Sequence, residues 1–397
     1  MNKIDFDYVA LTQALVKCPS VTPYDEGALQ VVEDHLKDLG FECTRLPFSE
    51  DGFNDIDNLF AIIGETGKHL AFAGHTDVVP PGNERSWKYP PFSGTIADEK
   101  IYGRGTEDMK GNIACFMSAT NSFISKYGKD FGGKLSFIIT GDEEKDAING
   151  TVKMMEWTKE KNIKFDHCIV GEPTSNKIIG DKIKIGRRGS ISFFITVKGV
   201  QGHTANSHLA ENPTHHLVSL LQRIISNPLD EGNEKFLPSS IQVPSIDVGN
   251  PAVNVIPEIA KATINIRFNN IHTSASLKQW LEDHIALQFN DVINASCSFR
   301  TDQTGDCFLT EPGDLSVIVS SACREITGKN MDPEFATDGG TSDARFIKNY
   351  CEVLELGLKN RTLHQVNENI NISDLKELHD IYPVSYTHLT LPTNREV

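Results

Sequence analysis

The sequence lacks a long apolar run and a surplus of basic residues, and each absence excludes a class of protein. None of its apolar segments approaches the roughly 20 residues that a membrane-spanning helix needs. Lys and Arg number 38 against 54 Asp and Glu, so the formal net charge is −16. Such a chain is unsuited to the phosphate backbone of nucleic acids or to an anionic membrane surface, because both attract clustered Lys and Arg.

Paired cysteines are also missing. The eight cysteines are spread along the chain, and no two of them form a CxxC pair. This spacing argues against a disulfide framework and against a zinc site built from thiolates. The first ten residues, MNKIDFDYVA, carry charge where a signal peptide has its apolar stretch. We therefore expect a cytoplasmic protein that has neither nucleic acid nor a membrane among its partners.

The sequence does contain the alternation of strands and helices that is typical of an α/β protein. Its 397 residues suggest two or three domains, at roughly 100–200 residues for each. Short apolar runs predict buried strands at 58–63, 69–74, 135–140 and 166–170. Helical periodicity marks 6–17, 25–39, 109–127 and 150–160. This alternation predicts a mostly parallel central sheet flanked by helices.

A second domain interrupts the first one. The order strand, helix, strand, strand, helix, strand is typical of a ferredoxin-like sandwich. It is predicted from segments at 190–198, 213–226, 240–247, 260–268, 274–287 and 295–300. An α/β pattern then returns at 315–326, 341–349, 352–356 and 373–382. We therefore expect a catalytic domain in two parts, 1–187 and 301–383, with an inserted domain at 188–300.

The end of the sequence does not fit this pattern. Residues 384–397, VSYTHLTLPTNREV, are rich in Thr and show no apolar periodicity. We expect this tail to be disordered or a foreign extension that shortens the last helix, and we assign it no role.

Candidate ligand residues follow the predicted strands. His75 directly follows the apolar run at 69–74, and Asp77 lies two residues further on. A histidine in this position can bind a metal through one ring nitrogen while a carboxylate holds the other N–H. A loop histidine with a capping aspartate is the alternative. The acids Glu143 and Glu144 also follow a strand, and they could instead be solvated loop residues; Glu172 follows the strand at 166–170.

Two further candidates lie in loops. Asp108 stands between a glycine-rich turn and a predicted helix, so it is either a helix cap or a ligand presented at the same sheet edge. His364 follows the predicted strand at 352–356 after a turn. The carboxyl ends of parallel strands meet at one edge of a sheet, where these candidates would converge. Nitrogen and oxygen ligands without sulfur suit Zn²⁺, Co²⁺ or Mn²⁺, and one bridging carboxylate would allow two ions.

Nine motifs in order along the chain resemble the dinuclear-zinc aminoacylase and carboxypeptidase family, which hydrolyses N-acyl amino acids. They are AFAGHTDVVP (71–80), YGRGTEDMKG (102–111), ITGDEE (139–144), VGEPT (170–174), GRRGS (186–190), QGHTAN (201–206), NVIP (254–257), GGTSD (339–343) and LHQVNE (363–368). The resemblance covers residues 1 to about 383. It implies two Zn²⁺ per subunit, which Co²⁺ or Mn²⁺ can replace. Their implied ligands are His75, Asp108, Glu144, Glu172 and His364.

The resemblance also implies individual roles. His75 and Glu172 would hold one zinc ion. Glu144 and His364 would hold the other. Asp108 would bridge the two, with a cis peptide bond to the next residue.

Asp77 would orient a ligand histidine and Glu143 would be the general base. The inserted domain would be a lid that forms a homodimer, in which His203 reaches the partner's site and stabilises the oxyanion. The implied substrate-carboxylate clamp consists of Arg187, Ser190, Asn254, Arg267 and Thr341.

The reaction that the resemblance implies is the hydrolysis of N-succinyl-L,L-2,6-diaminopimelate to succinate and L,L-2,6-diaminopimelate, on the route to lysine. Deacetylation of acetylornithine or dipeptide hydrolysis is the alternative within the family, and a metal-binding scaffold without catalysis is the alternative outside it. Two departures from the usual motifs concern Thr106-Glu107 and Thr337-Asp338, where smaller residues are more common. They bear on local substrate contacts rather than on the metal ligands.

Overall fold

The computed structural model describes residues 7–328 and 332–390. The chain forms two compact units. The first unit takes in Met1–Ile185, Thr310–Ala336 and Ser342–Val397, and the second takes in Gly186–Leu309 and Thr337–Thr341. The insertion was expected at 188–300. The second unit is longer because strand β15 (Ser296–Gly305) extends past residue 300 and β16 (Phe308–Leu309) pairs with β9 (Gly186–Arg187).

The first unit is built on a mixed sheet of eight strands in the described part of the chain. In spatial order these strands are β1 (Glu42–Arg45), β2 (Leu59–Ile63), β6 (Lys134–Thr140), β3 (His69–His75), β7 (His167–Val170), β18 (Glu352–Glu355), β8 (Lys182–Lys184) and β17 (Glu334–Ala336). The central neighbours β6, β3, β7 and β18 are parallel. The prediction of an α/β fold around a central sheet is therefore confirmed.

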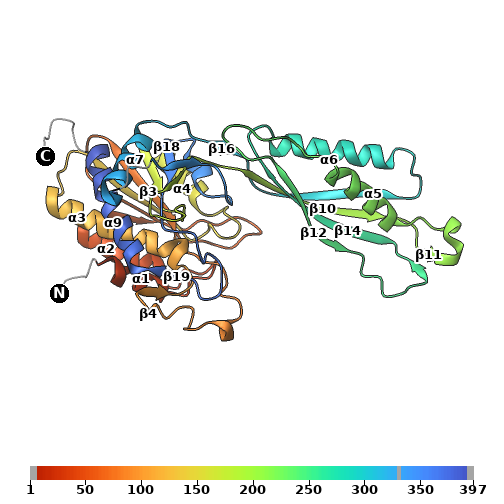
Figure 1. Ribbon diagram of the computed structural model, residues 1–397, viewed down its shortest axis with the longest axis horizontal. Coiled ribbons are helices and arrows are strands. Elements are labelled where there is room, and N and C mark those ends of the chain that lie inside the picture. The colour runs from red at the N-terminus through yellow and green to blue at the C-terminus, as the bar shows by residue number, and fades with distance from the viewer. Residues whose placement is uncertain (1–6, 329–331, 391–397) are drawn as a thin grey trace. The chain divides into compact units, whose positions relative to one another are not determined.

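Helices cover both faces of this sheet (Figure 1). They are α1 (Tyr8–Val16), α2 (Ala28–Leu39), α3 (Gly111–Tyr127), α4 (Thr151–Glu160), α7 (Asp314–Thr327), α8 (Ala344–Ile347) and α9 (Ile372–Thr390). Phe137 of β6 packs against Phe116 of α3, with ring centroids 5.3 Å apart. The next residue of β6, Ile138, pairs with Phe60, which contacts Trp157 of α4. Because successive strand residues point to opposite faces, α3 and α4 lie on opposite sides.

A small three-stranded sheet lies beside the main one in the chain's first unit. Its strands are β4 (Thr95–Ala97), β5 (Lys100–Tyr102) and β19 (Asn369–Asn371). The pairing of β19 with β5 places Ile370 opposite Ile101. It thereby brings the segment before β19 next to the segment after β5, although the two are far apart in the sequence.

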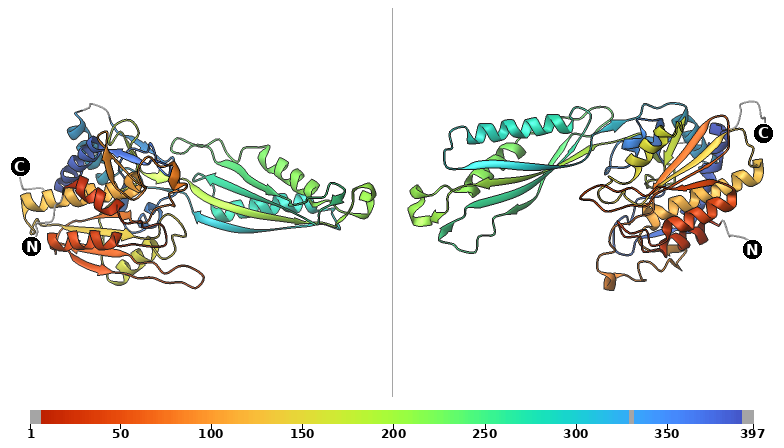
Figure 2. Two further views of the ribbon diagram at one scale, coloured as in Figure 1. Left: turned by 90° about the horizontal axis from the view of Figure 1, so that it is seen from below. Right: turned by 180° about the vertical axis from the view of Figure 1, so that it is seen from behind.

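The second unit contains a four-stranded antiparallel sheet. In spatial order its strands are β12 (Ser240–Asp247), β14 (Ile259–Phe268), β10 (Gly189–Lys198) and β15. The unit also contains β11 (Gly202–His203), a 3-10 helix (Thr204–Leu209), α5 (Pro213–Ile225), β13 (Val255–Ile256) and α6 (Ser274–Phe289). Helices α5 and α6 cover one face of this sheet (Figures 1 and 2). They bury its apolar side chains, which include Phe193 and Ile264. The chain order of these elements is the ferredoxin-like order that the sequence predicts.

The expectation for the tail is wrong for residues 384–390. Helix α9 does not end near residue 383 but continues to Thr390, with Pro383 inside it. Tyr386 is fully buried and its ring lies 4.8 Å from that of Phe116. Burial of this side chain against α3 outweighs the poor helix propensity of the segment. Residues 391–397 of the tail lie outside the described residues.

Across residues 7–328 and 332–390, no helix combines the length and the apolar character that a membrane span requires.

Candidate metal centre

Candidate ligands gather where the four central parallel strands end. His75 is the last residue of β3, and Glu172 follows the end of β7 at Val170. Glu144 follows β6, which ends at Thr140. Since these strands are parallel neighbours, their carboxyl ends lie at one edge of the sheet.

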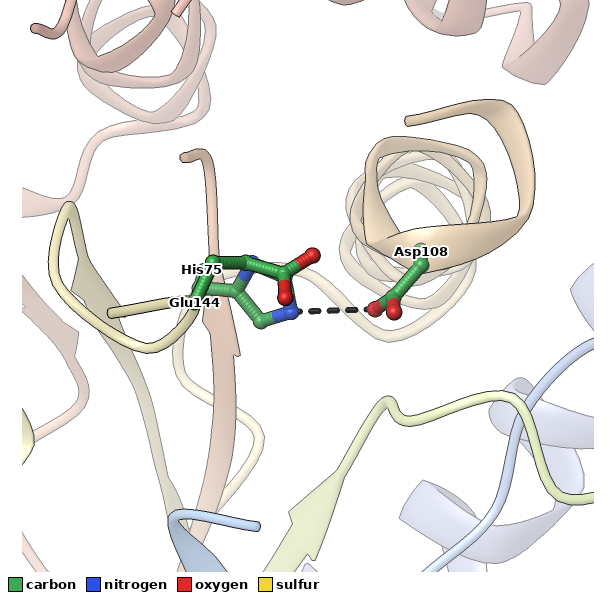
Figure 3. A group of neighbouring side chains, drawn as sticks. All are labelled: His75, Asp108 and Glu144. Carbon is green, nitrogen blue, oxygen red and sulfur yellow. Dashed lines mark hydrogen bonds and ion pairs between the residues drawn. The ribbon is translucent and has the colours of Figure 1, made fainter. Parts of the chain in front are cut away.

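Asp108 lies between two imidazoles. Its Oδ1 atom is 3.1 Å from Nε2 of His75, and its Oδ2 atom is 3.2 Å from Nε2 of His364. Helix α3 begins only at Gly111 and its N-cap is Lys110, so Asp108 is not the cap of this helix. Figure 3 shows the Asp108 carboxylate facing the His75 ring, with Glu144 beside them. The arrangement offers one carboxylate oxygen to each histidine.

Each imidazole also faces a second carboxylate. Glu172 Oε1 lies 3.6 Å from Nε2 of His75, and Glu144 Oε1 lies 3.1 Å from Nε2 of His364. Donor atoms that share a tetrahedral zinc ion lie about 3.4 Å apart, because each metal–ligand bond is about 2.1 Å long. The spacing and the nitrogen and oxygen chemistry of these donors therefore fit two divalent ions of the zinc type. In two groups of three residues, the possible ligand atoms all lie within 4.8 Å of one another. One group is His75, Asp108 and Glu144, and the other is His75, Glu143 and Glu172.

Asp77 acts on more than His75. The Nδ1 atom of His75 lies 2.9 Å from the backbone oxygen of Asp77 but 3.6 Å from its carboxylate. The carbonyl therefore makes the closer contact, where the sequence suggested the carboxylate. The Asp77 carboxylate instead accepts the backbone N–H groups of Glu143 and Glu144, at 3.2 and 3.1 Å. One side chain thus ties the β3 end to the loop after β6.

The three consecutive acids after β6 have separate surroundings. The Asp142 carboxylate accepts backbone N–H groups from Ala147, Ile148 and Asn149, so it holds its own loop. Glu143 lies with His75 and Glu172, and Glu144 lies beside His364.

The peptide bond between Asp108 and Met109 is cis, as the resemblance predicts.

The crowding of carboxylates changes the proton affinity of the histidines. Asp108 and Glu144 raise the pKa of His364 to about 10. Burial opposes a charge on His75, but Asp108 and Glu172 outweigh it and hold its pKa well above the usual value. Burial raises the pKa of Glu143 well above its usual value, and the charge of Glu172 adds to this effect. Carboxylates that favour a proton on an imidazole also favour a divalent cation there, so metal and proton compete.

The remaining predicted residues lie in the second unit. His203 is exposed, and its Nδ1 atom accepts the backbone N–H of Ala205 at 3.0 Å. In the neutral ring the proton is then on Nε2, which makes Nε2 a donor. The backbone oxygen of Asn254 accepts the N–H of Thr204 at 3.1 Å, so the motifs QGHTAN and NVIP lie side by side.

Four of the five residues of the predicted carboxylate clamp form two groups within this unit, and the fifth, Asn254, contacts Thr204. Ser190 of β10 is the cross-strand partner of Arg267 of β14. Arg187 is buried, and its Nη1 atom donates to the backbone oxygen of Gly340 at 3.3 Å, next to Thr341. Burial and the charge of Arg188 lower the pKa of Arg267. These side chains provide two guanidinium groups with neighbouring hydroxyls.

The sequence profile described as peptidase family M20/M25/M40 matches residues 71–383 of this chain. A succinyl-diaminopimelate desuccinylase from Nitrobacter hamburgensis is 50% identical over 380 residues, which is 95% of this chain and 97% of that protein. The chain belongs to peptidase family M20/M25/M40. The resemblance drawn from the motifs is therefore confirmed. As a member of family M20, the chain is a metal-binding hydrolase that acts on an amide bond.

Other relatives agree with this assignment. A succinyl-diaminopimelate desuccinylase from Parvibaculum lavamentivorans is 48% identical over 381 residues, covering 95% of this chain and 94% of that protein. An M20 metallo-carboxypeptidase from Sulfolobus solfataricus has the same fold, with a TM-score of 0.76 over 97% of this chain and 99% of that one. At 17% identity, this structure supports the fold alone.

Sequence reasoning missed several groups near the candidate ligands. The carboxylate of Asp343 is buried, and its charge adds to burial and to Glu172 in raising the pKa of Glu143. Within the motif GGTSD (339–343), which contains Asp343, the sequence interpretation gave a role to Thr341 alone. Glu107 and Glu368 contact the segments that carry Asp108 and His364. Their positions inside two quoted motifs were the available signal.

Proposed function

We propose that this chain hydrolyses N-succinyl-L,L-2,6-diaminopimelate with water to succinate and L,L-2,6-diaminopimelate. The relatives named for this reaction share about half of its residues over nearly its whole length. The observation that carries the proposal is the Asp108 carboxylate, which offers one oxygen to His75 and the other to His364. This arrangement suits a hydrolase with two metal ions.

The proposed cofactor is two Zn²⁺ per subunit, which Co²⁺ or Mn²⁺ can replace. His75 and Glu172 would hold one ion, Glu144 and His364 the other, and Asp108 would be shared. When bound, the ions would polarise the amide carbonyl and make a water molecule more acidic.

Glu143 is the proposed general base. It takes a proton from the attacking water as the new C–O bond forms, and it delivers this proton to the nitrogen as the amide C–N bond breaks. Its position beside His75 and Glu172 supports this role. The contact with Asp77 supports it as well. The Asp77 carboxylate accepts the backbone N–H of Glu143, which holds the proposed base near the end of β3, where His75 lies.

The substrate carries several carboxylates, whereas the chain has a formal net charge of −16. Arg187 and Arg267 are the proposed local counter-charges, since a planar guanidinium can bind a carboxylate through two bonds. Ser190, Asn254 and Thr341 are the proposed hydrogen-bonding partners of the same groups.

The proposed assembly is a homodimer in which His203 acts on the partner's site. Its exposed side chain supports this role, as does the Nδ1 contact with Ala205 that leaves Nε2–H as a donor. A donor of this kind stabilises the negative oxygen of a tetrahedral intermediate. We place the protein in lysine and diaminopimelate biosynthesis in the cytoplasm. Thiols that form no disulfide, such as those of the buried Cys115 and Cys168, are typical of that compartment.

The test is succinate release from N-succinyl-L,L-diaminopimelate by the purified, zinc-loaded protein. Acetylornithine and a dipeptide are assayed in parallel, since both are substrates of the alternatives within the family. Faster turnover of either one would replace the proposed substrate. Two bound metal ions with no hydrolysis of any N-acyl amino acid would favour a metal-binding scaffold.

A further inference from the structure

Asp108 lies in a short segment, a one-turn π-helix (Thr106–Lys110) whose backbone angles are not helical at Asp108 and Met109. His364 lies in the segment between β18 and β19. His364 has a φ of 60° and Asn367 a φ of 64°, which is a left-handed conformation that a strand cannot contain. The pairing of β5 with β19 ends at Tyr102 and Asn369, short of both segments. Beyond the end of this pairing, buried side chains link the two segments.

Glu107 extends from the first segment to the second. One of its carboxylate oxygens accepts the backbone N–H of Thr362 at 2.8 Å, and the other accepts that of Arg361 at 3.3 Å. Glu107 is 3% exposed, so water does not compete strongly for these bonds. The side chain next to Asp108 thus holds the backbone just before His364.

Glu368 makes the reciprocal contact. Its Oε1 atom accepts the backbone N–H of Glu107 at 2.9 Å, and its backbone oxygen accepts the N–H of Gly103 at 2.9 Å. The side chain is 0% exposed. A residue of the His364 segment therefore holds the backbone just before Asp108.

Arg104 closes this exchange. Its Nη1 atom lies 2.6 Å from Oε2 of Glu368, and the pair is buried. Its Nη2 atom donates to the backbone oxygen of His364 at 3.2 Å. Removing one member of a buried ion pair leaves the other charge uncompensated, so the three side chains act together.

We infer that Glu107, Glu368 and Arg104 are positioning residues that set the distance between Asp108 and His364, and with it the affinity for one of the two metal ions. The inference rests on the proposed ligand set. It goes beyond that set because the three residues are not proposed ligands: they contact backbone groups of the two segments and one another. Partners behind metal ligands commonly change metal affinity by about 10–100-fold.

The test is a titration of the full-length protein with Co²⁺, followed by its visible absorption. The variants are Glu107→Leu, which removes both acceptors, and Glu107→Gln, which keeps one. Glu33→Leu is the matched control, because Glu33 of α2 is a buried carboxylate that pairs with Lys37 of the same helix and with Arg45 of β1. Circular dichroism confirms that each variant is folded.

We expect Glu107→Leu to weaken one cobalt equivalent by about 10–100-fold and the other by less than about threefold. The cobalt affinity of Glu107→Gln should lie between those of Glu107→Leu and the parent. The control Glu33→Leu should bind both ions as tightly as the parent. Unchanged binding in folded Glu107→Leu, or an equal loss of both ions that the control shares, would overturn the inference.

Hydrogen exchange provides a readout that needs neither metal nor turnover. The amides of Arg361 and Thr362 should exchange at least about tenfold faster in Glu107→Leu than in the parent, because their acceptors are gone. Unchanged exchange would overturn the inference even if the ligand set were wrong. A parent that binds two cobalt ions but releases no succinate would count against the proposed substrate alone.

Discussion

Oδ2 of Asp108 lies 3.2 Å from Nε2 of His364. The other oxygen of the same carboxylate faces His75 at 3.1 Å. Two histidines from distant parts of the chain thus share one acid, and the chemistry proposed above depends on this arrangement.

The base assignment predicts that Glu143→Gln loses turnover but keeps its metal. General-base catalysis typically contributes about 10²–10⁴-fold, so kcat should fall by that amount. Succinate release and metal analysis on the same preparation test this expectation. Glu156→Gln, an exposed change on α4, is the control. Near-normal turnover by Glu143→Gln would contradict the assignment.

The trans action of His203 predicts complementation between two inactive proteins. In a mixed dimer of His203→Ala and Glu143→Gln, one site has both an intact Glu143 and an intact His203. Random mixing of equal amounts should restore about a quarter of the parental activity, because half of the dimers are mixed and each has one active site. Activity that stays at the level of the separate variants would show that His203 acts within its own chain or not at all.

Asp77 is predicted to matter through the loop that it holds. In Asp77→Asn the side-chain NH₂ faces a backbone N–H, so one of the bonds to Glu143 and Glu144 is lost. We expect kcat/KM and metal affinity to fall by about 10–100-fold. Asp55→Asn on the exposed surface should leave both unchanged, and equal behaviour of the two variants would count against this role.

The buried His69 predicts a loss of stability in acid. Its Nδ1–H donates to the backbone oxygen of Lys164 and its Nε2 accepts from Ser136, at 2.7 and 2.6 Å. Burial lowers its pKa from 6.5 to about 4. The unfolded chain therefore binds this proton first as the pH falls. The contribution to stability is complete above about pH 6.5 and declines toward about pH 4.

The measurement is urea unfolding of the parent and of His69→Gln at about pH 7.5 and about pH 5. The difference in unfolding free energy should shrink by about 2 kcal/mol at the lower pH, since Gln does not titrate. A difference that stays constant with pH would mean that His69 is not held neutral.

The end of α9 is predicted to stabilise the first unit. Tyr386→Ala removes a buried ring that contacts Phe116, and such truncations cost about 3 kcal/mol. Tyr386→Phe keeps the ring and loses the hydroxyl, which donates to the Phe116 backbone oxygen, so it should cost about 1 kcal/mol. Thermal unfolding measures both, and a Tyr386→Ala variant as stable as the parent would contradict this packing.

Part of this site is predictable from sequence because strand ends carry it. His75 and Glu172 follow apolar runs whose direction and parallel order place their ends together. Asp108 and His364 lie outside the strands, and their motifs marked them as candidates. The bonds by which Glu107 and Glu368 link the two segments join residues far apart in the sequence, so residue spacing does not indicate them.

Two features of the fold also depend on tertiary contacts. Residues 384–390 have weak helix propensity, and only the burial of Tyr386 reveals that α9 continues. The short pairing of β16 with β9 extends the second unit past residue 300, and two-residue strands leave no periodicity to detect.

The most direct test of the account is an anomalous difference map at the zinc edge, from crystals grown with zinc. Two peaks should lie on either side of Asp108, one beside His75 and Glu172 and the other beside Glu144 and His364. A single peak, or peaks away from Asp108, would contradict the shared-carboxylate site.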